Sequence, residues 1–240
     1  MAERDAFGPR LVRAAEVGVA TGTDRADVPL LLLDRPPVNA LDLATVVRLA
    51  DLVESLDGEA AVLTSEGRHF SAGHDRAEAG RIGEDGYLAD FAAALARILE
   101  AHSPLVGVLQ GQAVGTGWIL AACCEVLAVT EDALVRLPEV SLGLLGGAGH
   151  LSRWVAGPWL RRAVLLGEGV PARVLVANGA LEAADLASAR SVAVDVAARL
   201  AVPDTGSISA AREVLRGLSP DVARTHAEEM ARTIGLRDPR

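Results

Sequence analysis

Residues 110–149, QGQAVGTGWILAACCEVLAVTEDALVRLPEVSLGLLGGAG, are the stretch of sequence that decides the fold. The apolar run at 105–109 just before it predicts a buried strand, and the apolar segment at 118–124 predicts a helix. The turn between them carries three glycines, at positions 111, 115 and 117. Small residues let a ligand approach the backbone closely, and a helix that begins there directs unpaired N–H groups at that ligand. This turn therefore predicts backbone donors for a negatively charged oxygen.

A glutamate in the second half of this stretch is a candidate general acid and base. Another apolar run follows at 125–129, and after it Glu139 lies between Pro138 and Val140. In such apolar surroundings desolvation would raise the pKa of the carboxyl group, which suits a proton shuttle near neutral pH. The alternative is an exposed glutamate at the end of a strand.

The second informative motif is FSAGHD, at positions 70–75. Together with the glycine-rich stretch it resembles the crotonase, or enoyl-CoA hydratase/isomerase, superfamily, which has an F-x-A-G-x-D loop. Members of this superfamily bind acyl-CoA thioesters and stabilise an enolate-like oxyanion. The resemblance runs from about residue 31 to residue 166, with a weaker pattern to about residue 218. Because two separated motifs occur in the right order, the resemblance is specific for the family and much less specific for the reaction.

The resemblance implies roles for three catalytic residues. The amides of His74 and Thr116 would donate to the oxygen of a thioester enolate, and each such donor is worth ~3 kcal/mol of barrier. The family commonly has glycine where Thr116 stands, but the amide is present whatever the side chain. Glu139 would move the proton. The alternative for His74 and Thr116 is that they lie in two ordinary tight turns.

The resemblance also implies a set of residues along the substrate. The sequence RPPVNAL at 35–41 resembles the family's R-P-x-x-N-A-L stretch, which lies along the CoA moiety; a plain strand-to-helix connection is the alternative. The remaining positions come from the two loops and from the residue before Glu139. The predicted contacts are Pro37, Val38, Ala72, Gly73, Asp75, Gly117, Ile119 and Pro138. Asp75 could instead cap the segment that follows it.

Ile119 marks a departure from the hydratase pattern. Two-carboxylate hydratases of the family carry a second glutamate three residues after the second oxyanion donor, and that position here is Ile119. One carboxylate activates water less easily than two, whereas a single glutamate suits moving a proton along an allylic system. Both hydration and Δ3,Δ2-enoyl-CoA isomerisation remain open, with isomerisation favoured. Decarboxylation of a malonyl-type or glutaconyl-type acyl-CoA and a non-catalytic acyl-CoA-binding member are the alternatives.

Other polar residues near these motifs have a functional and a structural interpretation. His150 could assist a proton transfer or be satisfied locally at a helix start. Trp118 could line the acyl pocket or belong to the core, and Glu78 and Asp85 could turn toward a pocket or lie on the solvated surface. Three arginines could pair with CoA phosphates or lie on the surface: Arg35, Arg76 and Arg81.

Composition excludes several kinds of protein and site. The 240 residues are half apolar, enough for one domain with a sizeable core. The net charge is -9 and there is no basic run, which argues against nucleic acid as a partner. The absence of lysine excludes a Walker A loop or a Schiff-base lysine. The adjacent cysteines Cys123 and Cys124 suit neither a disulfide nor zinc.

The expected setting is the cytoplasm. The sequence shows neither a charged-then-apolar N-terminal signal nor an apolar run long enough to span a bilayer, so we expect no membrane contact. We also expect no metal and no separate cofactor, because coenzyme A enters as part of the substrate.

Alternating apolar strands and amphipathic helices indicate the α/β class. Residues 17–20 and 30–33 could form a hairpin, and a strand is expected at 60–64. Helices are expected at 43–56, 87–99, 151–166, 183–200, 208–218 and 222–234. The resemblance makes the architecture specific: a crotonase-like spiral of ββα units over residues 1–185, then a helical C-terminal trimerisation region of the same unit over residues 186–240. It implies a homotrimer or homohexamer.

Overall fold

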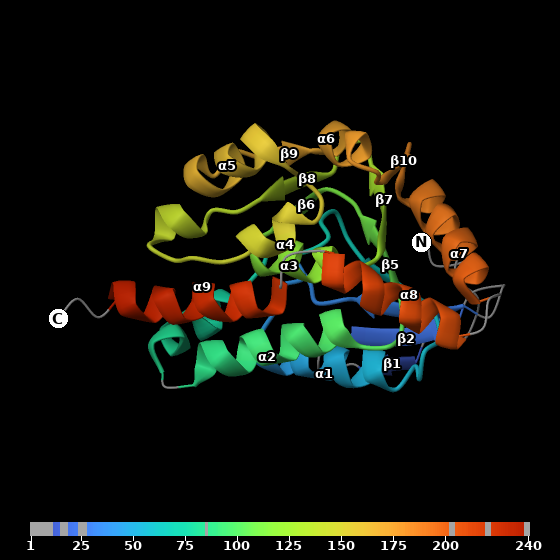
Figure 1. The fold of residues 1–240 in the computed structure, drawn as a ribbon, viewed down its shortest axis with the longest axis horizontal. Coiled ribbons are helices and arrows are strands. Elements are labelled where there is room, and N and C mark those ends of the chain that lie inside the picture. Colours follow the sequence, from blue (N-terminus) through green and yellow to red (C-terminus); the bar gives the residue numbers. More distant parts are fainter. Residues whose placement is uncertain are drawn as a thin grey trace.

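A computed structural model describes residues 12–14, 19–23, 28–84, 86–201, 205–218 and 222–237. Its largest sheet has seven strands in the order β1-β2-β3-β4-β5-β7-β10 (Figure 1). The first three pair antiparallel and the others parallel, which confirms the α/β class. The strands are β1 (Val12–Ala14), β2 (Val19–Thr23), β3 (Pro29–Leu33), β4 (Ala61–Ser65), β5 (Leu105–Leu109), β7 (Val126–Thr130) and β10 (Leu181–Ala183).

Two hydrophobic cores cover the two faces of this sheet. In β5, Leu105 and Leu109 belong to one core, and Val106 and Val108 belong to the other, because side chains alternate along a strand. The first core includes side chains of α1 (Leu43–Glu54), α2 (Tyr87–Glu100) and α3 (Thr116–Ala122). The second is closed by α7 (Leu186–Ala201). Burial on both faces explains why the parallel strands are continuous apolar runs.

The N-terminal half follows the sequence expectations closely. The helices expected at 43–56 and 87–99 are α1 and α2, with ends shifted by no more than two residues. Asp42 caps α1, because its carboxylate accepts from the Thr45 amide at 2.7 Å. β2 pairs with β3 as the hairpin hypothesis expects, although the turn at 24–27 lies outside the described residues.

The expectation of one helix over 151–166 is wrong. The chain forms α4 (Ala148–Ser152) and α5 (Gly157–Leu166), because Gly157 takes a φ of +61° and Pro158 starts a new helix. The expected helix at 183–200 also begins later, since Ala183 pairs with Thr130 in the sheet. A second sheet and one further helix were not expected: β6 (Gln112–Val114), β8 (Leu134–Arg136), β9 (Val170–Pro171) and α6 (Ala172–Ala177).

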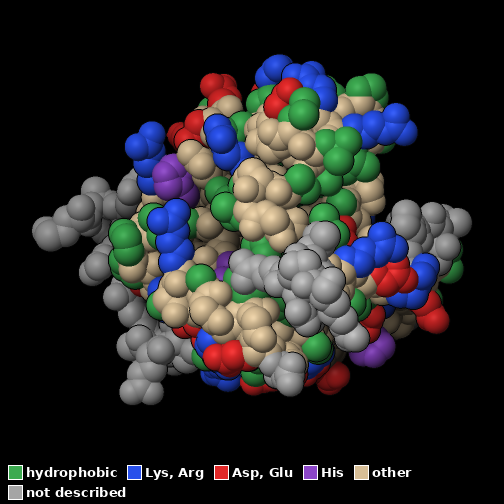
Figure 2. Space-filling model, turned by 90° about the vertical axis from the view of Figure 1, so that its left-hand side faces the viewer, with side chains coloured by type: hydrophobic (Ala, Val, Ile, Leu, Met, Phe, Trp, Pro, Cys, Tyr) green, Lys and Arg blue, Asp and Glu red, His purple; other side chains and the backbone are tan. Residues whose placement is uncertain are grey.

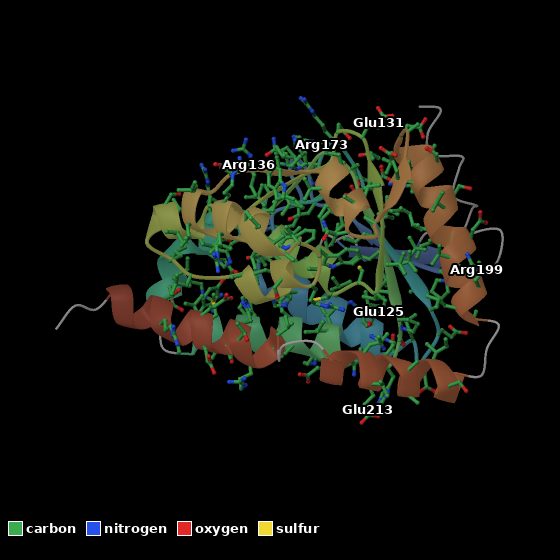
Figure 3. The ribbon with its side chains drawn as sticks, turned by 45° about the horizontal axis from the view of Figure 1, so that its top comes forward. Glu125, Glu131, Arg136, Arg173, Arg199 and Glu213 are labelled. Atoms are coloured by element: carbon green, nitrogen blue, oxygen red, sulfur yellow. The ribbon has the colours of Figure 1, made fainter. Side chains whose placement is uncertain are left out.

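The last two helices, α8 (Thr205–Leu218) and α9 (Val222–Arg237), agree with the expected segments. Arg212 of α8 is buried and donates to Glu125 at 2.7 Å, whereas Glu213 beside it points away from the body of the molecule (Figure 3). Figure 1 shows α9 alongside α2. The domain boundary and the trimerisation role of these helices stay predictions. Within the described ranges, no helix combines the length and apolar character that a membrane span requires.

Candidate active site

The loop that carries FSAGHD is held by hydrogen bonds on both sides of His74. The Leu41 amide donates to the Gly73 carbonyl at 2.8 Å, and the Asp75 amide donates to the Leu41 carbonyl at 2.9 Å. The Gly73 amide donates to Oγ of the buried Ser71 at 3.1 Å. Gly73 has a φ of +88°, which only glycine adopts at no steric cost. The amides immediately before and after that of His74 are therefore both used inside the protein.

A second loop brings Thr116 beside the first. The Gly115 amide donates to the Arg136 carbonyl at 2.8 Å, and Thr116 then begins α3. A Cβ added at Gly73 would lie 3.5 Å from the Thr116 nitrogen, so the two loops are in contact. Among the residues that the structure describes, neither the His74 amide nor the Thr116 amide donates a hydrogen bond. Two free N–H groups on neighbouring loops can together stabilise a negative oxygen.

Glu139 is packed against the backbone of the second loop. It begins the 3-10 helix η3 (Glu139–Leu142), and a Cβ at Gly115 would collide with its Oε1. Its Oε2 is buried and has no hydrogen-bond partner within the described part of the chain. Burial raises the pKa of Glu139 to about 7; its own amide opposes the shift and the charge of Glu229 adds to it. This carboxyl group can therefore exchange a proton near neutral pH, next to the free amide of Thr116.

Ile119 stands in α3 at the position where the sequence comparison expects a second carboxylate. Its side chain is buried, and a Cβ at Gly147 would lie 3.3 Å from Ile119 Cγ1. The loop that follows η3 thus packs on an apolar residue of α3. The sequence of α3, TGWILAA, contains no carboxylate.

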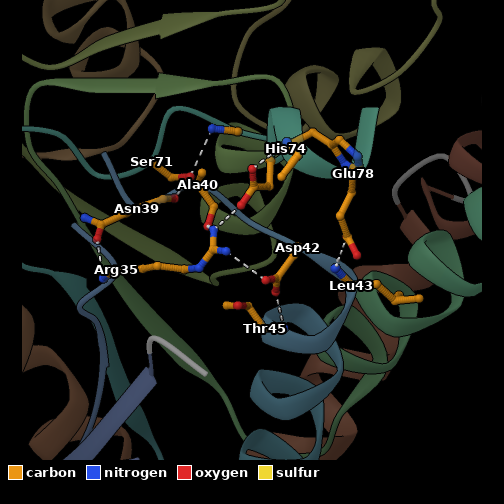
Figure 4. A network of polar contacts seen from close by, with 12 residues as sticks. Arg35, Asn39, Ala40, Asp42, Leu43, Thr45, Ser71, His74 and Glu78 are labelled. Carbon is orange, nitrogen blue, oxygen red and sulfur yellow. Dashed lines mark hydrogen bonds and ion pairs between the residues drawn. The ribbon is translucent and has the colours of Figure 1, made fainter. Parts of the chain in front are cut away.

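Glu78 neither turns toward a substrate pocket nor lies free on the solvated surface, the two positions that the sequence left open. It lies in the 3-10 helix η2 (Arg76–Gly83), half-buried, and accepts from the Leu43 amide at 2.9 Å (Figure 4). The Tyr87 hydroxyl donates to it at 2.8 Å and Arg81 at 2.7 Å. Burial acts to raise the pKa of Glu78, but these three donors together hold it below its ordinary value. Glu78 is thus a firmly ionised anchor; Asp85 lies outside the described residues.

Tyr87 connects this anchor to the His74 ring. The one proton of the Tyr87 hydroxyl goes to Glu78, so the Tyr87 oxygen must accept from His74 Nε2 at 3.1 Å. Burial lowers the pKa of His74, against the charges of Glu78 and Asp75. Phe91 also contacts the ring, with centroids 5.0 Å apart. Burial therefore favours a neutral imidazole, and the hydrogen bond to Tyr87 places its proton on Nε2, which leaves Nδ1 as an acceptor.

Asp75 and Arg35 join the two family-like motifs. Asp75 caps η2 by accepting from the Ala77 amide at 2.8 Å, which confirms the capping interpretation. Arg35 forms ion pairs with Asp75 and, at 2.9 Å, with Asp42 (Figure 4). The Ala77 amide and Arg35 lower the pKa of Asp75. Arg35 therefore has an internal structural role, between the RPPVNAL turn and the FSAGHD loop.

The predicted substrate contacts fall into two groups. Pro37 and Val38 are exposed in one turn, and the amide of exposed Ala72 donates to the Val38 carbonyl at 2.9 Å. Gly117 lies against Ser71, while Pro138 precedes Glu139 on the other side of the site. The fold thus gathers the predicted residues around the two loops; their contacts with CoA stay predictions.

His150 and Trp118 both lie in the interior. Trp118 is fully buried, which agrees with the core interpretation. His150 is 1% exposed, its Nδ1 has no partner among the described residues, and its ring lies edge-on to that of His226 at 5.1 Å. Burial holds the pKa of His150 well below its ordinary value, so the ring is neutral. The expectation that a local hydrogen bond satisfies this histidine does not hold at Nδ1.

Sequence reasoning missed three parts of the site. It assigned Gly115 to ligand approach, whereas this glycine makes room for Glu139 itself. It placed Tyr87 on an apolar helix face, where the only hint was that the chain has a single tyrosine. It gave α9 a role in trimerisation but none at this site, although Glu229 of α9 influences the pKa of Glu139. Local sequence carries no signal for this last contact.

The described residues offer no group of three or more histidine, cysteine, aspartate or glutamate side chains for a metal. Cys123 and Cys124 are buried free thiols, and burial raises the pKa of Cys123 to about 12. The face seen from the left-hand side of Figure 1 has hydrophobic side chains and backbone near its centre and charged side chains toward its edges (Figure 2).

Comparison with known proteins places this chain in a family. A family model described as enoyl-CoA hydratase/isomerase matches residues 23–233. A Rhodococcus jostii protein named (7aS)-7a-methyl-1,5-dioxo-2,3,5,6,7,7a-hexahydro-1H-indene-carboxyl-CoA hydrolase is 33% identical, over 92% of this chain and 89% of its own. The 2,3-dehydroadipyl-CoA hydratase of Escherichia coli is 30% identical, over 89% and 84%.

Solved structures agree with the sequence matches. DspI from Pseudomonas aeruginosa has a TM-score of 0.74 and 25% identity, covering 95% of this chain and 99% of its own. An enoyl-CoA hydratase/isomerase from Xanthobacter autotrophicus has a TM-score of 0.79 at 22% identity, covering 91% and 87%, and shows the shared crotonase fold. The chain belongs to the enoyl-CoA hydratase/isomerase family, that is, to the crotonase superfamily.

Proposed function

We propose that this protein is an acyl-CoA enzyme that stabilises a thioester enolate through the amides of His74 and Thr116, with Glu139 as its single proton carrier. The observation that carries the proposal is the contact between Glu139 and Gly115, the residue before Thr116. It puts a carboxyl group with a pKa of about 7 next to an amide without a partner. Proton transfer at carbon and stabilisation of the thioester oxygen would thus take place on the same bound substrate.

The reaction that needs least from this site is isomerisation of a β,γ-unsaturated acyl-CoA. The Glu139 carboxylate removes a proton from the α carbon, and the electron pair moves to the thioester oxygen, which accepts from the two amides. The same carboxyl group returns the proton to the γ carbon, and the double bond moves to the α,β position. Hydration would require one carboxyl group both to activate the water and to deliver a proton to the neighbouring carbon, which is harder than with two, and α3, with Ile119, supplies no second carboxyl group.

Hydrolysis is the second candidate, favoured by relatives at 33% and 34% identity that are named hydrolases of a bicyclic dioxo acyl-CoA. In this chain, Glu139 would take a proton from water as the oxygen adds to a ketone carbon. Cleavage of the adjacent carbon–carbon bond yields a carboxylic acid and leaves an electron pair that is delocalised onto the thioester oxygen. Glu139 then protonates the carbon, so one water is consumed and the CoA ester stays intact.

The first experiment follows the ultraviolet absorbance of the conjugated enoyl thioester. A rise with a trans-3-enoyl-CoA, and no loss with crotonyl-CoA, supports isomerisation. Loss of absorbance from crotonyl-CoA means hydration. For the second candidate, a bicyclic dioxo acyl-CoA is followed by mass spectrometry: a gain of one water without free CoA thiol supports carbon–carbon hydrolysis. No change in absorbance or mass with any of the three substrates contradicts both candidates.

A proline at position 116 tests the backbone donor directly. Thr116→Pro removes the N–H group at the first position of α3, where a helix tolerates proline. We expect kcat with the active substrate to fall by about 10²- to 10³-fold. Thr116→Ala keeps the amide and is the matched control, with kcat close to that of the wild type. Equal activity of the two variants would rule out the Thr116 amide as a donor.

A further inference from the structure

The C-terminal helix α9 is fixed against the loop that follows Glu139. The Thr233 hydroxyl accepts from the Leu145 amide at 2.8 Å and donates to the Leu145 carbonyl at 3.2 Å. One turn earlier on the helix, Oε1 of Glu229 accepts from the Ala148 amide at 3.2 Å. These contacts hold α9 at two points, one in the loop after η3 and one at the first residue of α4.

Gly146, between those two points, shows how close α9 comes to Glu139. A Cβ added there would lie 3.1 Å from Cε of Met230 and 4.0 Å from Cε1 of His226, both on α9. The same Cβ would lie 3.8 Å from Cγ of Glu139. One face of α9 and the Glu139 side chain thus meet across a residue that has no side chain.

The Glu229 carboxylate is held within this space. Its side chain is 13% exposed, and its Oε2 lies 3.4 Å from Nδ1 of His226, which is itself 5% exposed. His226 in turn contacts the neutral, buried ring of His150. The carboxylate is therefore anchored by the Ala148 amide on Oε1, lies beside His226 at Oε2, and is largely withdrawn from the water that would screen its charge.

We propose that Glu229 is a positioning residue that acts through Glu139: its negative charge favours the protonated form of the Glu139 carboxyl group. The inference rests on the proposed function, because it concerns the same proton carrier. It supplies from α9 the electrostatic influence of a second carboxylate that α3, with Ile119, does not carry.

The surroundings of Glu139 support this direction. Burial is the main cause of its raised pKa, and the charge of Glu229 shifts the pKa in the same sense, as like charges do. Among the described residues, the elements packed near η3 also carry His226 of α9, His150 of α4 and the exposed Arg161 and Arg162 of α5. The α3 residues Thr116 and Ile119 do not titrate.

The test measures the protonation of Glu139 without substrate. Protein labelled with ¹³C at the glutamate side-chain carboxyl is titrated by NMR, and the Glu139 signal is assigned with Glu139→Gln. In Glu229→Gln, which keeps an acceptor for the Ala148 amide, we expect the Glu139 midpoint to move to lower pH by a fraction of a unit. Glu228→Gln removes the same charge from the exposed side of the same helix, where Glu228 pairs with Arg224. This control should leave the midpoint unchanged.

An unchanged or higher midpoint in Glu229→Gln would overturn the proposal, and so would an equal shift in Glu228→Gln. If glutamine at 229 prevents folding, Glu229→Met fills the same space without charge and carries the same expectation. The pH dependence of kcat/KM with the active substrate should shift in the same direction. If no acyl-CoA is turned over, the proposed function fails while the NMR midpoints still decide the role of Glu229.

Discussion

Two short 3-10 helices, η2 and η3, each present a half-buried glutamate near the same pair of loops, and the two carboxyl groups differ in their partners. Glu78 on η2 accepts from an amide, a phenol and a guanidinium. Glu139 on η3 has a buried oxygen with no partner among the described residues. Their pKa values therefore shift in opposite directions, to below the ordinary value for Glu78 and up to about 7 for Glu139.

This difference shows that burial alone does not make a glutamate an acid or a base. Burial acts on both carboxyl groups in the same sense, but the three donors around Glu78 replace the water it loses. Glu139 receives no such compensation on Oε2. A carboxyl group becomes a proton carrier near neutral pH where the fold removes water and withholds donors, and it becomes an anchor where the fold supplies them.

The largest expected effect separates the two groups by activity. Glu139→Gln should lower kcat by about 10³-fold with whichever acyl-CoA the enzyme turns over, because the amide cannot carry the proton. Glu78→Gln removes a charge of the same kind at an anchor and should cost less than about tenfold. Steady-state kinetics of the two purified variants make the comparison. Equal losses would mean that Glu139 has no special role.

The surroundings of Glu139 could largely be predicted from the sequence. The apolar neighbours Pro138 and Val140 predict burial, and the motif order predicts the nearby oxyanion loops. The sheet, α1 and α2 were predictable for a related reason: their periodicity reflects burial of residues close together in the chain. The structure confirms α1, α2 and the buried oxygen of Glu139, whereas the oxyanion role of the loops stays a prediction.

The partners of the two glutamates could not be read in the same way. Glu78 is anchored by Leu43, 35 residues earlier, and α9 reaches the Glu139 loop from residues more than 80 positions later. Such contacts depend on how helices pack, and no local periodicity encodes them. The break at Gly157 and Pro158 is different, because that dipeptide is a local signal that the apolar spacing of 151–166 obscured.

The second expected effect is an opposite dependence of stability on pH. The unfolded chain gives Glu139 its ordinary pKa of 4.5, against about 7 in the fold, so wild-type stability falls as pH rises between these values. Glu139→Gln does not suffer this loss and should exceed the wild type by about 2 kcal/mol at pH 8, with little difference at pH 4. Urea unfolding at the two pH values measures it.

Glu78→Gln provides the opposite case in the same experiment. Because the pKa of Glu78 is lowered in the fold, its stabilisation is present above the ordinary pKa and is lost as the pH falls through the lowered one. This variant should be less stable than the wild type by about 1–2 kcal/mol at pH 8, since charged hydrogen bonds are weakened, and the gap should narrow in acid. Shifts of the same sign in both variants would contradict the distinction between anchor and proton carrier.

The smallest expected effect concerns whether Glu78, through Tyr87, sets the tautomer of the His74 ring. Tyr87→Phe removes the hydroxyl that links Glu78 to His74 and keeps the aromatic contact, whereas Phe91→Leu alters a ring contact to His74 and keeps the hydroxyl. If the Glu78–Tyr87 pair sets the His74 tautomer, ¹⁵N NMR should find the ring proton on Nε2 in the wild type and in Phe91→Leu, and a mixture in Tyr87→Phe. The loss of one hydrogen bond corresponds to about 1 kcal/mol, so kcat in Tyr87→Phe should fall by no more than about fivefold. An unchanged tautomer in Tyr87→Phe would mean that Glu78 holds η2 in place but does not set the His74 tautomer. The orientation of the His74 ring would then come from packing alone.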